Sequence, residues 1–142
     1  MNTIRLALLV SIGSCVLGCG GSSQSRVVLR KSAREAFNAA EAAFDGKDFS
    51  LAEKEYTAAL AGGLNIDSLD TAGVKRAVSR AELGNLDQAM ADLVEWEQNA
   101  MQMDLVYAAQ SYVLEKQGDT KQAKAAWKKA RRINRRVRKF GD

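Results

Sequence analysis

The thiols of Cys15 and Cys19 are the side chains of this 142-residue chain best suited to covalent chemistry. Both lie among the first 19 residues, and no cysteine follows them, so neither can form a disulfide with the rest of the chain. Histidine is absent, which removes the commonest general base and the usual zinc or haem ligand. A histidine-based triad therefore cannot accompany these thiols, and a zinc site there would lack its usual ligand.

Carboxylates are the other candidate reactive groups, and their spacing does not favour a catalytic pair. Glu53 and Glu55 are two residues apart, as are Glu95 and Glu97, so on a helix the two members point to different faces. The sequence has no glycine-rich phosphate loop, no metal-ligand spacing and no nucleophile beside a base. We therefore expect no enzymatic activity, no metal and no cofactor.

The segment that carries both cysteines has the layout of an export signal. Arg5 gives it a positive start, residues 6–12 are apolar, and small residues follow. This apolar run is too short to span about 30 Å of hydrocarbon, which favours a secretory signal peptide over a membrane-spanning helix. Its end, Val16-Leu17-Gly18-Cys19, resembles the lipobox of bacterial lipoproteins.

The lipobox resemblance implies a lipid anchor on Cys19. In that family a diacylglycerol alkylates the cysteine thiol, the leader (here 1–18) is removed, and the new N-terminus is acylated. Acyl chains contribute about 0.8 kcal/mol per buried CH₂, so two or three chains anchor a protein firmly. Ile12-Gly13-Ser14-Cys15 is a poorer match with a shorter apolar segment. The alternatives to a lipid anchor are an unlipidated signal peptide or two buried cysteines.

The residues after Cys19 predict a location and a linker. In enterobacterial lipoproteins an aspartate after the cysteine resembles a signal for retention in the inner membrane. No aspartate follows Cys19, so the resemblance implies the outer membrane, with the protein facing the periplasm. Gly20, Gly21 and the next serines are typical of a flexible coil, so residues 19–31 are expected to form a linker.

Beyond the linker the apolar residues follow a helical period. Helices are predicted over residues 32–45, 49–61, 70–83, 86–99, 103–117 and from 120 to at least 133. Asp48 is the expected N-cap of the second helix, while Asn85 with Gln88 and Asp119 with Gln122 resemble capping boxes. The last helix is expected to continue, with Ile133, Val137 and Phe140 extending its apolar stripe.

The helices carry an internal repeat. Gly118-Asp119-Thr120-Lys121-Gln122-Ala123 has weaker copies around Ala89 and Ala52, and the three alanines are 34 and 37 residues apart. Self-similarity near 34 residues is typical of stacked helical hairpins. Residues 33–137 resemble the tetratricopeptide repeat (TPR) family, although Trp96 fills a small-residue position, the terminal proline is missing and the first hairpin has three extra residues.

The resemblance implies an all-α solenoid of about three repeats over residues 32–137, with a basic tail at 138–142; a plain helical bundle is the alternative. Small residues would allow close helix contact at eight positions, Ala40, Ala52, Ala59, Ala77, Ala89, Ser111, Ala123 and Ala130. The first helix of each hairpin would line a partner-binding groove through Phe37, Glu41, Phe44, Val74, Val78, Glu82, Leu105, Tyr112 and Glu115. Such a groove suits an apolar or cationic segment, whereas Phe37 and Glu41 replace the family's carboxylate clamp.

Charge divides the chain. Residues 32–118 carry 7 basic and 15 acidic side chains, while residues 121–142 carry 10 basic residues and one acidic residue. Basic side chains are expected to form a surface or a polar cap at the end of the stack, through Arg131, Arg132, Arg135, Arg136, Arg138 and Lys139. Contact with anionic lipid or an acidic partner is the alternative to a cap, and the export signal argues against nucleic acid.

These features together predict a membrane-anchored protein–protein interaction adaptor at the bacterial cell envelope. Its protein or peptide partners are not identified by the sequence, and self-association could complete a short groove. The alternative is a structural subunit or assembly factor of an envelope or secretion complex.

Overall fold

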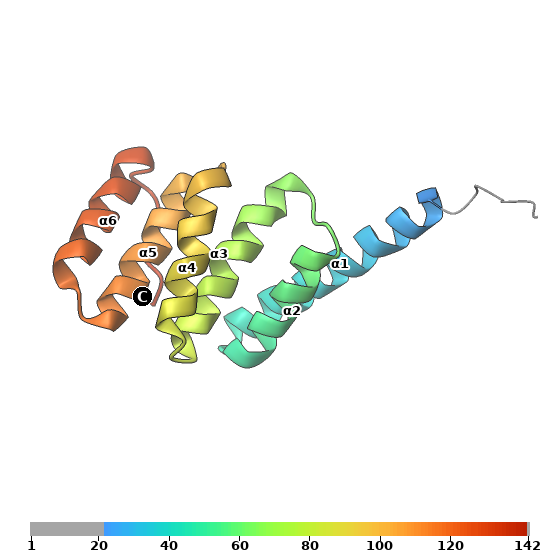
Figure 1. Cartoon of the computed structure of the whole chain (residues 1–142), viewed down its shortest axis with the longest axis horizontal. Helices are drawn as coiled ribbons and strands as arrows, with labels where there is room; N and C mark the ends of the chain where they lie inside the picture. Colours follow the sequence, from blue (N-terminus) through green and yellow to red (C-terminus); the bar gives the residue numbers. More distant parts are fainter. Residues whose placement is uncertain (1–21, 142) are drawn as a thin grey trace, which may run out of the picture.

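The computed structural model describes residues 22–141, and within that range the regular elements are six α-helices (Figure 1). Consecutive helices pack against one another as three hairpins, which confirms the predicted all-α, repeat-like stack. The helices are α1 (Ser22–Asp45), α2 (Phe49–Ala61), α3 (Ile66–Glu82), α4 (Leu86–Asn99), α5 (Met103–Gln117) and α6 (Thr120–Ile133). The export signal and Cys19 lie outside the described residues.

Local capping explains several helix ends. Asp48 accepts a hydrogen bond from the Leu51 amide at 3.1 Å, and Asp119 accepts two from Gln122, from its amide at 2.9 Å and its side-chain nitrogen at 2.5 Å. Gly118 ends α5 in the left-handed conformation with φ of 86°, which glycine adopts without a steric penalty. Asn85 makes no side-chain capping bond, so the prediction of a capping box there is wrong.

Two helices begin earlier than the sequence predicts. The predicted linker is helical from Ser22 and continuous with the part of α1 that packs against the turn after α2. There Ala33 is buried, and a Cβ on Gly62 would lie 2.7 Å from the Cβ of Ala33. Tertiary packing of this kind outweighs weak local helix propensity. Helix α3 begins at Ile66 because Asn65 caps it, accepting from the Ser68 amide at 3.3 Å.

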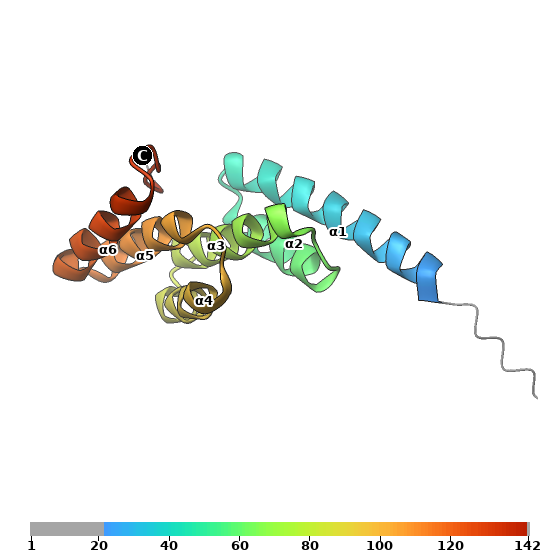
Figure 2. The same ribbon diagram turned by 90° about the horizontal axis from the view of Figure 1, so that it is seen from above.

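The last helix ends at Ile133, and the expected continuation to Phe140 is wrong. The Asn134 side chain donates to Asp104 at 2.7 Å and accepts from the Arg136 amide at 2.9 Å. Such side-chain bonds compete with helical ones and turn the backbone. Residues 134–141, called the tail below, then fold back over α5, on the side of the molecule from which α1 also protrudes (Figures 1 and 2).

The core forms two clusters joined through α3. Ala40, Tyr56 and Ala72 belong to a cluster centred on the first hairpin, whereas a larger cluster including Leu93 and Val113 joins α3, α4 and α5. The eight small positions of the repeat are all fully buried, as close helix contact requires: Ala40, Ala52, Ala59, Ala77, Ala89, Ser111, Ala123 and Ala130.

Trp96 breaks the small-residue pattern, and Gly73 makes room for it. A Cβ on Gly73 would collide with the indole ring of Trp96, which packs against the larger cluster. At this contact the large residue lies on α4, and the space for it comes from the glycine on α3, which has no side chain.

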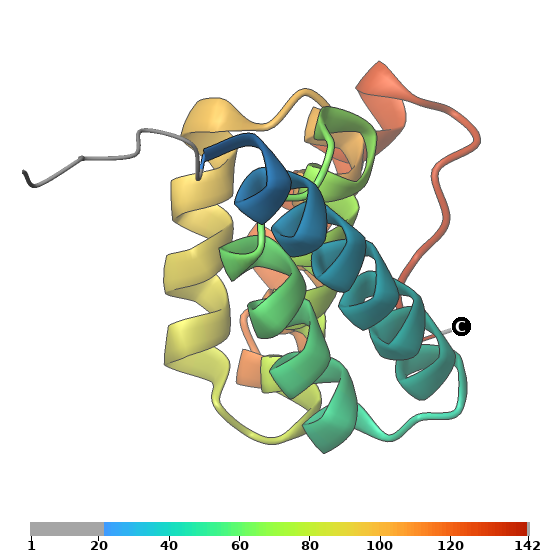
Figure 3. The ribbon, with the colours of Figure 1, turned by 90° about the vertical axis from the view of Figure 1, so that its right-hand side faces the viewer.

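The end-on view shows α1 lying across the front of the stack, beside the loop that joins α2 to α3 (Figure 3). None of the helices within residues 22–141 is both long and apolar enough to span a membrane.

Candidate partner-binding surface

The first helices of the three hairpins, α1, α3 and α5, are neighbours in the stack and form what we call the inner surface. Most of the predicted groove residues offer some side-chain area there: Phe37, Glu41, Phe44, Glu82, Leu105 and Tyr112 are half-buried, and Glu115 is exposed. Val74 and Val78 do not, because they are 0% and 2% exposed inside the larger core cluster. Both point inward on α3, so the expectation that they line a groove is corrected.

Each of the three glutamates on this surface is paired with a lysine of the next element. Lys75 on α3 lies 2.6 Å from Glu41 on α1, and Lys116 on α5 lies 2.8 Å from Glu82 on α3. Lys139 of the tail lies 2.7 Å from Glu115 on α5. The first two pairs are separated by the same 34 residues, so the repeat reproduces the ion pair along with the helices.

Tyrosines hold two of these glutamates in place. Tyr56 donates to Glu41 at 2.5 Å, and Tyr112 donates to Glu82. Burial and the neighbouring carboxylate raise the pKa of both phenols, so they stay protonated and remain donors. Burial alone would raise the pKa of Glu82, but the hydrogen bonds from Lys116 and Tyr112 outweigh it and hold that pKa below its ordinary value.

The lysines also cover aromatic rings. The Lys75 ammonium lies 4.9 Å from the ring centre of Phe44, and that of Lys116 lies 5.2 Å from the ring centre of Tyr112. These contacts complete a row of mutually neutralised groups along the inner surface. The carboxylates of Glu41 and Glu82 are therefore not free to attract a cationic partner, which the sequence alone could not reveal.

The tail closes the inner surface over α5. Phe140 packs against Tyr112 with ring centres 6.4 Å apart, and it also touches the larger core cluster. Two groove residues predicted from the sequence, Tyr112 and Glu115, are therefore already occupied by the chain's own C-terminal residues.

The inner surface is open at α1. A cavity of about 850 Å³ lies between α1 and the loop that leads into α3. Its walls carry three cations of α1 and apolar side chains, and the lining residues are Arg30, Lys31, Arg34, Phe37, Gly62, Gly63, Leu64, Asn65, Ile66 and Ser68. Of these three cations, only Lys31 has an acidic partner within the described residues, an exposed pair with Glu35 at 3.9 Å. Arg30 and Lys31 were missed as site residues because they fall in the predicted linker.

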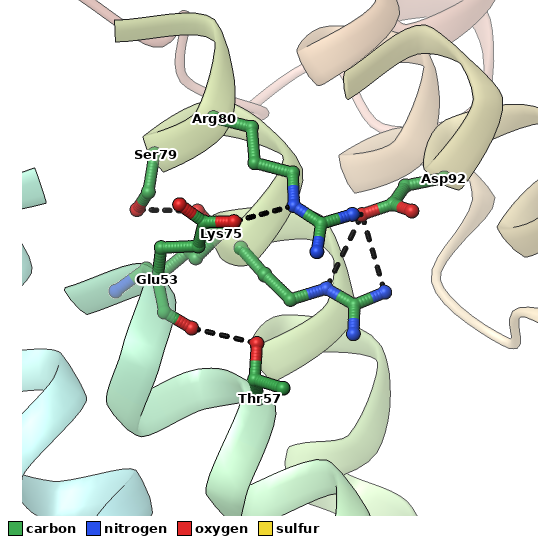
Figure 4. A network of polar contacts seen from close by, with 7 residues as sticks. Glu53, Thr57, Lys75, Ser79, Arg80 and Asp92 are labelled. Carbon is green, nitrogen blue, oxygen red and sulfur yellow. Dashed lines mark hydrogen bonds and ion pairs between the residues drawn. The ribbon is translucent and has the colours of Figure 1, made fainter. Parts of the chain in front are cut away.

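A second polar network lies between α2, α3 and α4 and fixes their relative positions (Figure 4). Arg80 bridges Glu53 at 2.8 Å and Asp92 at 2.7 Å, and Arg76 reaches the same Asp92 oxygen at 3.1 Å. Both arginines are less than one-fifth exposed. Every charged group in this network has a partner, so the loss of one would leave an uncompensated charge between the helices, and no group is left for a ligand.

The predicted basic surface is divided between the end of α6 and the tail. Its five arginines are exposed: Arg131, Arg132, Arg135, Arg136 and Arg138. Lys139 is half-buried against Glu115, so it serves the fold rather than a free basic patch.

No family model, curated protein or solved structure matches this chain. Among residues 22–141 no cluster of three or more His, Cys, Asp or Glu could hold a metal ion.

Proposed function

We propose that this protein is a lipid-anchored adaptor of the TPR type that recruits a protein partner at the bacterial cell envelope. The leader and the lipobox resemblance around Cys19 support the anchor. The buried small residues at the 34-residue period support a TPR-like stack. Helix α1 leads from the anchored end of the chain into the open part of the inner surface.

The cavity beside α1 is the observation that carries the proposed binding role. Arg30 and Arg34 present unpaired positive charge next to the apolar side chains of Phe37, Leu64 and Ile66. Arginine is well suited to carboxylates, and an apolar wall beside it adds buried area. The partner is therefore proposed to be a segment that combines acidic and apolar side chains.

Photo-crosslinking in the native host tests this role. Phe37 is replaced by p-benzoylphenylalanine in one strain, and the exposed Val94 on α4 is replaced in a control strain. We expect one discrete envelope adduct from position 37, lost when Arg34→Glu replaces one positive charge of the cavity wall with a negative one. Equal adducts from both positions, or none from position 37, would contradict the proposal.

A direct binding measurement complements the crosslink. A labelled peptide of glutamates and phenylalanines is titrated onto the full chain and followed by fluorescence anisotropy. Arg34→Glu should weaken binding at least tenfold, because one attractive contact becomes repulsive, whereas Arg135→Glu, the same change outside the cavity, should leave it unchanged. Equal losses in the two variants would mean that only net charge matters.

The anchor has its own test. Intact mass and membrane fractionation are compared for the chain and its Cys19→Ser variant, expressed in the native host. We expect a mature chain that begins at Cys19 and carries acyl chains, and a variant that loses both the lipid and the membrane association. An unacylated, uncleaved wild-type chain would overturn the proposed compartment.

The alternative function is a structural subunit of an envelope assembly. The ion-pair row and the seated tail favour it, because they leave little of the inner surface free. A structural subunit should co-purify with its partner at fixed stoichiometry and be unstable alone, whereas an adaptor should be stable alone and exchange its partner.

A further inference from the structure

The C-terminal tail lies on α5 as a segment bound by side chains. Phe140 contacts Tyr112, and Lys139 pairs with Glu115. Within the described residues, no backbone hydrogen bond joins residues 135–141 to another element. The side-chain contacts that hold the tail include those of its last few residues, among them the Lys139 ammonium 5.8 Å from the Trp127 ring centre on α6, and the Asn134–Asp104 bond at the start of the tail.

From this arrangement we infer that the surface around Tyr112 is a binding site for a lysine–aromatic–glycine segment. The tail fills this site in cis, and a partner segment of the same chemistry can bind there when it displaces the tail. This site is separate from the cavity beside α1 and does not depend on the proposed adaptor role. Its ligand class is given by the residues already seated in it.

The geometry accounts for each element of that segment. The Phe140 ring lies 6.4 Å from Tyr112 at an interplanar angle of 51° and is partly buried against the core, which provides most of the apolar contact. Glu115 accepts from the preceding lysine at 2.7 Å. Gly141 has φ of 89°, and a Cβ there would lie 2.6 Å from the Tyr112 ring, so a larger residue would both strain the backbone and meet the ring.

The site is formed without help from the tail. The Tyr112 hydroxyl donates to Glu82, and Lys116 covers the same ring while pairing with Glu82. These partners belong to α3 and α5, so they fix the ring whether or not Phe140 is present. A preorganised site binds a segment with less loss of conformational freedom.

The covalent link makes the tail a strong competitor. A segment tethered by a short chain has an effective concentration of about millimolar order. A separate peptide of the same sequence should therefore bind the wild-type chain weakly, and removing Phe140 from the chain should strengthen that binding.

Fluorescence anisotropy on the full chain tests the inference, with a labelled peptide of residues 134–141 as the probe. We expect Phe140→Ala in the protein to tighten peptide binding at least tenfold. The matched control is Arg138→Ala, since Arg138 is exposed and makes no side-chain hydrogen bond or ion pair among the described residues. It should leave the affinity near that of the wild type. The same peptide with Phe140→Ala should not bind either protein.

A second substitution separates the site from a general effect of loosening the fold. Tyr112→Ala, added to the Phe140→Ala protein, should abolish peptide binding, while circular dichroism reports whether the helices persist. If a folded Phe140→Ala protein fails to bind the peptide, the tail is only a terminal cap and the inference is overturned. The crosslink at position 37 would be unaffected by that outcome, so the two proposals fail independently.

Discussion

The Trp96 ring packs directly against Gly73, with no space for a Cβ, and this contact gives a prediction for a single residue. Glycine inside a helix normally costs about 1 kcal/mol relative to alanine. Here we expect Gly73→Ala to destabilise the protein by about 1–3 kcal/mol, because its Cβ would collide with the Trp96 ring. Urea unfolding measures the change.

The double variant Gly73→Ala with Trp96→Leu provides the control for this prediction. A smaller side chain at position 96 relieves the collision, so the cost of Gly73→Ala should shrink or change sign in that background. A Gly73→Ala protein that is more stable than the wild type would show that α3 and α4 have room to separate.

Glu82 makes stability depend on pH. Its pKa is lowered in the folded state, because the bonds from Lys116 and Tyr112 outweigh the effect of burial. The unfolded chain therefore binds the proton more readily, so the stabilisation is complete above the ordinary glutamate pKa of about 4.3 and is lost as pH falls through the folded value. Glu82→Gln should reduce the slope of unfolding free energy against pH between about 5 and 3. An unchanged slope would mean that groups other than Glu82 make the stability depend on pH in this range.

Sequence reasoning identified single residues where the partner is local. Asp48 and Asp119 were predictable as caps because a cap's partner is close in sequence, and each of them accepts from an amide three residues later. Lys75 and Lys116 were not recognised as partners of Glu41 and Glu82, since a 34-residue separation leaves no local signal. The ion pairs of the inner surface could therefore be found only from the structure.

At the scale of elements, Asp70 joins α3 to the loop between α4 and α5. Its carboxylate, 3% exposed, accepts from the amides of Met101 and Gln102, each at 2.7 Å. We expect Asp70→Ala to cost about 3 kcal/mol, because two amides lose their carboxylate acceptor in a partly buried setting. Hydrogen exchange should accelerate at these two amides first, whereas Asp70→Asn should retain part of their protection. Uniform acceleration along the chain would contradict a local role.

Local signals predicted most helix boundaries, although the start of α3 was missed despite the local cap at Asn65. Helices α2, α4 and α5 begin and end at the predicted residues. The start of α1 was missed because the Gly- and Ser-rich composition of residues 20–25 predicts coil. The packing of Ala33 on Gly62 also leaves no signal in the sequence. The end of α6 was missed because an apolar stripe through Phe140 fits a helix as well as a tail that folds back.

At the scale of the whole molecule, the two core clusters predict unequal stability along the stack. The first hairpin has the smaller cluster and meets the rest mainly through α2, whereas α3, α4 and α5 share the larger one. Repeat stacks depend on contacts between neighbours, and their ends open first. Hydrogen exchange should therefore show weaker protection in α1 and α2 than in α3 and α5. Equal protection throughout would indicate a single cooperative unit.

The folded-back tail also determines how the molecule would respond to a mechanical load. If the N-terminal end is held at a membrane and a partner pulls on the C-terminus, the force reaches α5 through Phe140 and Lys139 before it reaches the end of α6. Rupture of those side-chain contacts would release residues 134–141, roughly 27 Å of extended chain, while the helices stay folded. The tail would then lengthen reversibly under a load on the C-terminus before the helical stack itself is strained.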